Sequence, residues 1–188
     1  MFDVIPDHGI DPDRLETASD GRVLADDAAA VQLLNSAAAA VVGYLRWCPW
    51  PRRTDTVVLD GNGTDVLSLP SRHVVAVDSV AIDGVPLGGA GYRWSQTGMV
   101  ERIGWMWPDG FRRITVTFTH GVDEVPNFLS DIIVGLAARN AASPGGRVMV
   151  RAGGVAEQWS GESAAGGLLA PERAALDDYR IGGGGFGV

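Results

Sequence analysis

The amino-acid sequence predicts an α+β fold in which helices flank a small antiparallel β-sheet or barrel-like insertion, with extended amino- and carboxy-terminal arms. Three observations support this prediction. Apolar residues recur at alternating spacings of three and four over residues 26–47, they alternate with polar residues between 54 and 119, and helical spacing returns over 124–142. The chain has 188 residues, of which 46% are hydrophobic, so it is long enough to bury one core and leave tails.

The chain is expected to have three parts. Residues 1–25 form an acidic amino-terminal arm, residues 26–146 a central domain, and residues 147–188 a Gly-rich carboxy-terminal tail that binds a partner. The arm has few basic residues, and its Pro and Gly residues interrupt any helical pattern, so we expect it to become ordered only against a neighbour. Its acidic residues are Asp3, Asp7, Asp11, Asp13, Glu16 and Asp20.

The first helix of the central domain is predicted over residues 26–47. Asp26 and Asp27 suit a helix amino terminus, and Pro49 supplies a stop. Several alanines surround the apolar stripe, which permits close approach by a second helix or by a copy of the same helix. The predicted buried stripe is Val31, Leu34, Ala38, Val41 and Leu45.

Turn signals divide the β region, residues 54–119, into five or six short strands. Asp60-Gly-Asn-Gly63 stands between two apolar segments, which predicts a hairpin whose turn needs positive φ angles. Asp83-Gly84 and Gln96-Thr-Gly98 predict two further turns, the first of them after a longer strand at 74–82. These short segments favour a small antiparallel sheet or barrel.

The last strand leads directly into the second helix, predicted over 124–142. Ile114, Val116 and Phe118 alternate with threonines, so one face of the strand is apolar and the other is solvated. Ser143-Pro-Gly-Gly146 ends the helix. The predicted buried stripe of the helix is Val125, Leu129, Ile132, Ile133 and Leu136.

The tail, residues 147–188, is rich in Gly, Ala and Ser and contains one short predicted helix near 171–179. A segment with so few large apolar residues cannot bury a core by itself. We therefore expect a chain cut after Ser143 to keep a folded domain. The large apolar residues of the tail are spaced like anchors for another surface: Trp159, Leu168, Leu169, Tyr179 and Phe186.

Charge and cysteine content exclude several classes of protein. The formal net charge of -8 argues against sequence-independent binding of nucleic acid, since phosphate affinity depends on clustered cations. The single cysteine, Cys48, excludes an internal disulfide framework. No segment is expected to span a membrane, and the amino terminus lacks a signal-peptide pattern. We therefore expect a cytoplasmically made protein without a membrane partner.

No constellation of residues predicts an enzyme, a metal site or a cofactor. His8, His73 and His120 lie far apart, without a second His or Cys at metal-ligand spacing, and His120 is expected to satisfy backbone groups at a strand-to-helix corner. Asp60 to Asp65 has the alternating oxygens of a calcium loop but lacks the distal Glu. Ser160 lacks the first glycine of a nucleophile elbow.

An aromatic segment, Trp105-Met-Trp107 followed by Phe111, allows two interpretations. Its side chains could close one end of the sheet, as large residues often do in small β domains. Alternatively, they form an exposed loop that docks on a partner, because Trp and Met are enriched in interface cores.

Several segments together resemble the head-to-tail connector, or head-completion adaptor, proteins of long-tailed bacteriophages, particularly those of actinobacteria. Besides the leading helix, the similarity lies in Leu69–Leu87, Tyr92-Arg-Trp94 and Val116–Pro126, and spans roughly residues 26–145 with a weaker echo at 172–180. The resemblance implies a virion protein without catalytic residues or a cofactor, and residues 26–146 are then its adaptor domain.

In such a family the expected assembly is a ring of twelve identical subunits below the portal protein at the capsid vertex. The helices pack subunit to subunit, the tail reaches into the portal, and a neck or tail-completion protein binds below. DNA passes through the lumen without specific binding. The residues expected to contact the portal or a neighbouring subunit are Trp105, Trp107, Trp159, Leu168, Leu169, Tyr179, Arg180 and Phe186.

A different class of protein remains as the alternative, a small β-rich module that binds a carbohydrate or another ligand. In that case Trp94, Trp105 and Trp107 would form a stacking platform. The two long flanking helices are not needed by such a module, which favours the adaptor interpretation.

Overall fold

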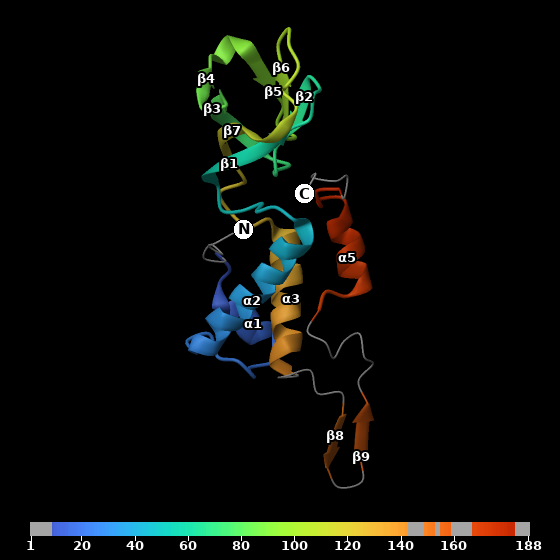
Figure 1. Cartoon of the computed structure of the whole chain (residues 1–188). Helices are drawn as coiled ribbons and strands as arrows, with labels where there is room; N and C mark the ends of the chain where they lie inside the picture. Colours follow the sequence, from blue (N-terminus) through green and yellow to red (C-terminus); the bar gives the residue numbers. More distant parts are fainter. Residues whose placement is uncertain (1–8, 143–148, 153–154, 159–166, 183–188) are drawn as a thin grey trace. The chain divides into compact units, whose positions relative to one another are not determined.

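The computed structural model describes residues 9–142, 149–152, 155–158 and 167–182 (Figure 1). The chain forms two compact units. The helical unit comprises residues 1–45 and 125–178, and the β unit comprises residues 46–124 and 179–188. In chain order the β unit is therefore inserted between two long helices, which confirms the predicted α+β class.

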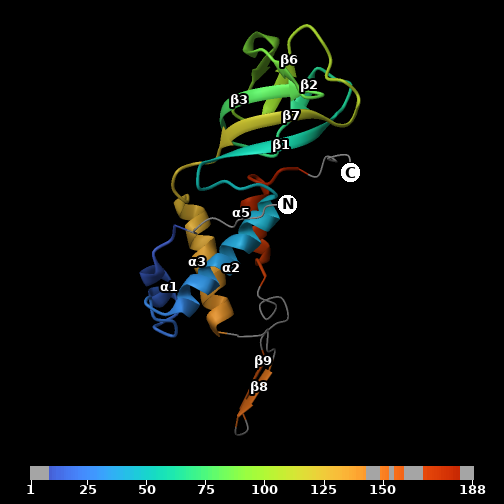
Figure 2. The ribbon, with the colours of Figure 1, turned by 60° about the vertical axis from the view of Figure 1, so that its left-hand side comes forward.

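The described residues of the helical unit form four helices and a short hairpin. Helices α2 and α3 lie side by side in Figures 1 and 2, α1 packs on both, and α5 contacts α2. The hairpin pairs β8 with β9 in antiparallel register. The elements are α1 (Pro12–Ala18), α2 (Ala28–Leu45), α3 (Asn127–Ala142), β8 (Met149–Ala152), β9 (Val155–Gln158) and α5 (Ala170–Asp177).

Helix α2 begins where the sequence places its carboxylates. An Asp27 Oδ1 atom accepts a hydrogen bond of 2.9 Å from the Ala29 amide, which satisfies one of the free donors of the first turn. The predicted stripe is correct except at Val31, which is exposed, while the small residues Ala30 and Ala37 are buried as well. The buried residues are Ala30, Leu34, Ala37, Ala38, Val41 and Leu45.

The composition of α2 has a second consequence. In the described part of the chain, α2 is the one helix long and apolar enough to cross a membrane by length and composition, which the sequence prediction did not anticipate. A core helix passes the same test, and one side of α2 is buried against the other helices of its unit.

The amino-terminal segment differs from the predicted arm. Residues 10–25 are part of the helical unit, and their three buried apolar side chains, Ile10, Leu15 and Val23, anchor them there. Asp11, one of the acidic residues of the predicted arm, accepts a hydrogen bond of 3.0 Å from the Asp13 amide and caps α1. The sequence analysis missed these three residues because they are widely spaced and it considered mainly the charged residues of the segment. Residues 1–8 lie outside the described residues.

Helix α5 makes part of the predicted tail a component of the helical unit. Leu168 and Leu176 are buried, and Arg139 of α3 forms an ion pair of 2.8 Å with Glu172. The Tyr44 hydroxyl of α2 donates a hydrogen bond of 2.5 Å to Asp177. These contacts come from segments far away in the sequence, so the short tail helix is stabilised by tertiary packing.

The β unit is built from two antiparallel sheets. One has the strand order β1-β7-β3-β4, and the other has the order β2-β6-β5. A short 3-10 helix, η1 (Gly89–Gly91), precedes β5. The strands are β1 (Arg53–Gly61), β2 (Val66–Ser68), β3 (Val74–Ile82), β4 (Val85–Leu87), β5 (Tyr92–Trp94), β6 (Met99–Arg102) and β7 (Gly110–His120).

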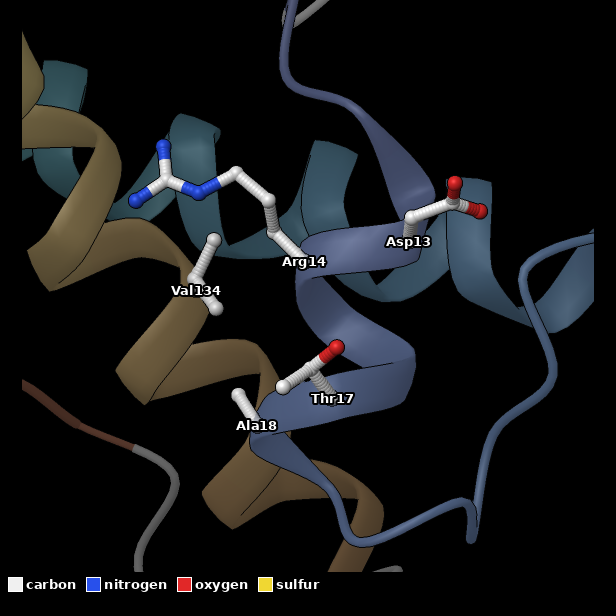
Figure 3. Close-up of a pocket in the computed structure, with 5 residues that line it drawn as sticks. All are labelled: Asp13, Arg14, Thr17, Ala18 and Val134. Atoms are coloured by element: carbon white, nitrogen blue, oxygen red, sulfur yellow. The ribbon is translucent and has the colours of Figure 1, made fainter.

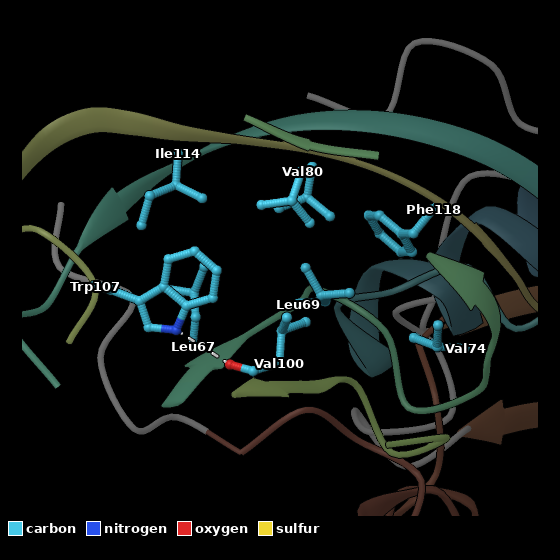
Figure 4. Close-up of a cluster of buried hydrophobic side chains, with 9 residues drawn as sticks. Leu67, Leu69, Val74, Val80, Val100, Trp107, Ile114 and Phe118 are labelled. Atoms are coloured by element: carbon cyan, nitrogen blue, oxygen red, sulfur yellow. Dashed lines mark hydrogen bonds between the residues drawn. The ribbon is translucent and has the colours of Figure 1, made fainter. Parts of the chain in front are cut away.

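The core of the β unit lies between these sheets. In Figure 4 the side chains of Ile114, Val80 and Phe118 from the larger sheet point toward Leu67, Leu69 and Val100. The predicted alternation along β7 is confirmed, since Ile114, Val116 and Phe118 are buried between the partly exposed threonines. The full cluster is Leu67, Leu69, Val74, Val80, Val100, Trp107, Ile114, Val116 and Phe118.

Two of the three predicted turns join paired strands. Asp83 and Gly84, with φ angles of 50° and 79°, connect β3 to β4, as a two-residue hairpin turn requires. Gly98 has a φ of 90° in the β5–β6 turn, and a Cβ atom there would lie 2.2 Å from the Ser71 carbonyl oxygen. Only glycine fits this close approach.

The predicted hairpin at Asp60-Gly-Asn-Gly63 is wrong. β1 pairs with β7, and β2 pairs with β6, so the turn moves the chain from one sheet to the other. The Asn62 side chain builds this loop by donating to the Val66 carbonyl at 2.9 Å and accepting the Thr64 amide at 3.1 Å. Such local bonds fix the loop without fixing the strand that pairs with β1.

Candidate interaction surfaces

The most conspicuous titratable group, His120, is part of the core. It is 1% exposed, its Nε2 atom lies 3.0 Å from an Asp55 carboxylate oxygen, and its ring packs on Phe118 with centroids 4.9 Å apart. Burial lowers its pKa from the ordinary value. The sequence predicted backbone partners, but Asp55 is the partner, itself paired with Arg53 at 2.8 Å. No substrate reaches this imidazole.

The described residues contain no group of three His, Cys, Asp or Glu side chains placed to hold a metal ion. His73, in the loop before β3, has its Nε2 atom 3.3 Å from the Gln96 amide nitrogen of the β5–β6 turn, while His8 lies outside the described residues. Asp60 accepts the Arg112 amide at 2.6 Å, so one oxygen of the calcium-like sequence is used within the fold. Ser160 also lies outside the described residues.

One hollow of the helical unit lacks the features of a binding site. One depression of about 380 Å³ is lined by Asp13, Arg14, Thr17, Ala18 and Val134 of α1 and α3 (Figure 3). The figure shows the Asp13 and Arg14 side chains pointing in different directions. Arg14 is already bound to Ser130 and, at 2.6 Å, to Asp131. Binding sites usually present a few convergent polar groups, which are missing from this hollow.

The first candidate interaction surface is the exposed side of α2, which we call the uncharged face. None of the 18 residues of this helix is charged. Surface helices of soluble proteins normally carry charged residues opposite their buried stripe. The exposed residues of the uncharged face are Ala28, Val31, Gln32, Ser36, Ala40 and Gly43.

The second candidate surface is the turn between β6 and β7. Its two tryptophans, both predicted to be interface residues, differ in their exposure to solvent. Trp107 is 1% exposed, and its indole Nε1 donates a hydrogen bond of 3.2 Å to the Val100 carbonyl. Trp105 and Met106 are 73% and 67% exposed. Trp107 therefore closes the core, as the first interpretation expects, and only Trp105 and Met106 are exposed as the second interpretation requires. Trp107 is not available as an interface residue or as part of a sugar-stacking platform.

The remaining interface candidates lie near the carboxy terminus. Leu168 is buried within the helical unit, Leu169 is half-buried, and Tyr179 is exposed. In the β unit, Trp47 Nε1 donates to the Tyr179 carbonyl at 2.8 Å, and Arg72 donates to the Arg180 carbonyl at 2.9 Å. Trp159 and Phe186 lie outside the described residues.

The net charge is divided unequally between the two units. The helical unit has 14 acidic residues and six arginines, which accounts for the whole net charge of -8. The β unit has nine acidic residues and nine arginines and is neutral. Composition alone did not predict this asymmetry, because the boundary between the units follows the fold.

Three solved structures share this fold. The chain is similar to a chain from the neck of a native gene transfer agent particle computed with C12 symmetry. The match has a TM-score of 0.63 and 20% sequence identity, and it covers 98% of this chain and 96% of the neck chain. A neck chain of the empty particle computed with C6 symmetry gives a TM-score of 0.63, 19% identity and the same coverage.

The third structure, the virion of the native gene transfer agent particle, contains a chain with a TM-score of 0.63 and 20% identity, over 97% of this chain and 96% of the other. The sequence matches no protein-family model and no curated protein. At these identities the comparisons show the fold, and the match includes both the helical unit and the β unit.

Proposed function

We propose that this protein is a structural virion protein, a head-to-tail adaptor that forms a ring under the portal, extends the DNA channel and joins the capsid to the neck or tail. One observation carries the proposal: nearly the whole chain has the fold of a neck chain from a particle computed with C12 symmetry. The described residues add no convergent catalytic or metal site that favours an enzyme.

A twelve-fold ring needs a contact in which one face of a subunit meets a different face of the next. The uncharged face of α2 suits one half of that contact. Its small side chains, such as Ala40 and Gly43, permit close helix approach, and no charged group of α2 has to lose its water. Its exposure in the single chain supports packing against a neighbouring subunit.

The charge distribution suits a channel through which DNA moves. A wall with net negative charge repels phosphate, so DNA is not retained by salt bridges. In this protein the negative charge belongs to the helical unit. We therefore assign the channel wall to the helical unit.

The carboxy-terminal segment is the proposed attachment to the portal, with a neck or tail-completion protein as the partner below the ring. Leu169, Tyr179 and Arg180 remain candidate contact residues, together with Trp159 and Phe186 of the undescribed segments. Leu168 stabilises the helical unit instead. The assembled protein would be located in the virion neck after assembly in the host cytoplasm.

The mass of the purified protein in solution, alone and mixed with the portal protein of the same particle, tests the proposal. Size exclusion with light scattering should give a ring or a stable complex with the portal. A protein that stays monomeric and does not bind the portal protein at concentrations of tens of micromolar would refute the adaptor function.

A further inference from the structure

An uncharged, exposed rim on the β unit is not explained by the fold. It consists of two segments, Val85–Gly91 and Ile103–Pro108, neither of which contains a charged residue. The Ile103 amide donates a hydrogen bond of 2.9 Å to the Gly91 carbonyl, which holds the segments together. We call this surface the apolar rim. Its most exposed large side chains are Val85, Ile103, Trp105 and Met106.

Hydrogen bonds and core packing fix the conformation of the turn that carries the apolar rim. Trp107 is fixed in the core, and its amide donates to the Thr64 carbonyl at 2.6 Å. Arg102 donates to the Met106 carbonyl at 2.6 Å, while its guanidinium lies 5.9 Å from the centroid of the Trp107 ring. The turn is therefore held in a shape that keeps Trp105 and Met106 in solvent. Clustered exposed apolar side chains of this kind mark interaction sites.

The electrostatics of the β unit favour a second copy of this chain as the partner. The unit has no net charge, and several of its surface charges are paired internally, as in Arg93–Glu101 at 2.6 Å and Arg113–Asp83 at 2.5 Å. Two β units therefore approach without net repulsion, whereas two helical units each carry the negative charge. The two segments of the rim contain no charged residue, and the neighbouring Arg102 guanidinium is bound to the Met106 carbonyl.

The same β unit also offers a surface of threonines, the outer face of β1 and β7, which is bordered by Asp78 of β3, whose carboxylate accepts a hydrogen bond of 3.2 Å from the Thr119 hydroxyl. Thr54 faces Thr119 and Thr56 faces Thr117, with hydroxyl oxygens 2.8 and 2.9 Å apart. Exposed Val58 completes this face. Because the hydroxyls are already paired with each other, covering them leaves few polar groups without a partner.

We propose that the apolar rim of one subunit packs on the outer face of β1 and β7 of the next copy, as a second contact of the ring. This inference rests on the proposed ring-forming function. It combines two different faces of one chain, which is what a head-to-tail ring requires. The partner is thus the β unit of a second copy, not the portal.

Photo-crosslinking reads the partner directly. p-Benzoylphenylalanine placed at position 105 is irradiated in the ring, assembled with the portal if the chain alone is monomeric, and the linked peptides are identified by mass spectrometry. We expect links to residues 53–61 or 110–120 of a second copy. The same probe at Thr97, an exposed position of the β5–β6 turn, is the control and should not give these links.

Links from position 105 to the portal, to a helical unit or only within its own chain would overturn the inference. A second measurement uses Trp105→Glu, which should weaken ring formation at least tenfold while the melting temperature stays unchanged, whereas Trp105→Phe should assemble normally. If rings form and Trp105→Glu assembles like the wild type, this inference fails and the adaptor function stands. If no variant forms a ring or a portal complex, both fail.

Discussion

Replacing Trp107 by alanine should destabilise the β unit far more than the same replacement two residues earlier. Trp107 is 1% exposed in the core cluster, and truncating such an aromatic residue costs about 3–5 kcal/mol. The lost hydrogen bond to the Val100 carbonyl adds about 1 kcal/mol, because that carbonyl loses its partner. Together we expect about 4–6 kcal/mol for Trp107→Ala, and a change within about 0.5 kcal/mol for Trp105→Ala.

Hydrogen exchange measures this difference within the correct unit. The amides of Ile114 and Val116 lie in β7, the strand that pairs with both β1 and β3, so their slowest exchange reports opening of the β unit. Each 1.4 kcal/mol of destabilisation accelerates this exchange about tenfold, so Trp107→Ala should accelerate it by at least a factor of about 1,000. The Leu136 amide in α3 should be less affected.

The matched variant makes the outcome decisive, since both changes remove the same atoms from the same turn. Equal acceleration by Trp105→Ala and Trp107→Ala would refute the assignment of one tryptophan to the core and the other to the surface. Unchanged exchange in both variants would refute the described core itself.

Four further predictions follow from the described contacts. Leu15→Ala should destabilise the helical unit by about 2–5 kcal/mol in urea unfolding, whereas an amino-terminal arm without core contacts would give no change. Leu176→Ala should do the same, so a chain cut after Ser143 should still fold but be less stable than the full chain; equal urea midpoints would contradict this. Since burial lowers the folded pKa of His120, the unfolded chain binds a proton first, and stability should fall by at most about 1.4 kcal/mol per unit as the pH drops below about 6.5. His120→Gln should remove that dependence in thermal unfolding. Ala40→Glu should block ring formation in light scattering without a change in far-ultraviolet circular dichroism, because it places a charge on the uncharged face.

The sequence predicted the elements whose information is local. The α2 and α3 helices lie within a few residues of their expected bounds, and the Asp83-Gly84 turn joins the strands on either side of it. These features depend on periodicity and on positive φ angles, which are properties of a short segment.

The pairing of strands that lie far apart in the sequence could not be predicted from such local patterns. The Asp60-Gly-Asn-Gly63 segment has the letters of a hairpin turn, but β1 finds its partner about fifty residues further along, in β7. A local turn signal fixes the direction of the chain and leaves the partner strand open. For the same reason the sequence could not place Leu15 in the helical unit, since its contacts come from α2 and α3.

The candidate surfaces show a third kind of limit, because Trp105 and Trp107 have the same chemistry in one turn. The tertiary hydrogen bonds distinguish them. The Trp107 indole donates to the Val100 carbonyl in the core, and Arg102 donates to the Met106 carbonyl beside exposed Trp105. The sequence therefore predicted that aromatic residues matter in this turn, but not which of them faces a partner.

The separation of charge from apolar surface explains how one chain could serve both a DNA channel and a ring. A wall that repels DNA also repels its own copies, so a subunit with evenly distributed negative charge would resist assembly. In this chain the net negative charge belongs to the helical unit, while helix α2 has no charged residue and the β unit has no net charge. In the proposed ring, contacts through those surfaces would bring no charged side chain of α2 against a neighbouring copy, and the net negative charge of the helical unit would face the channel.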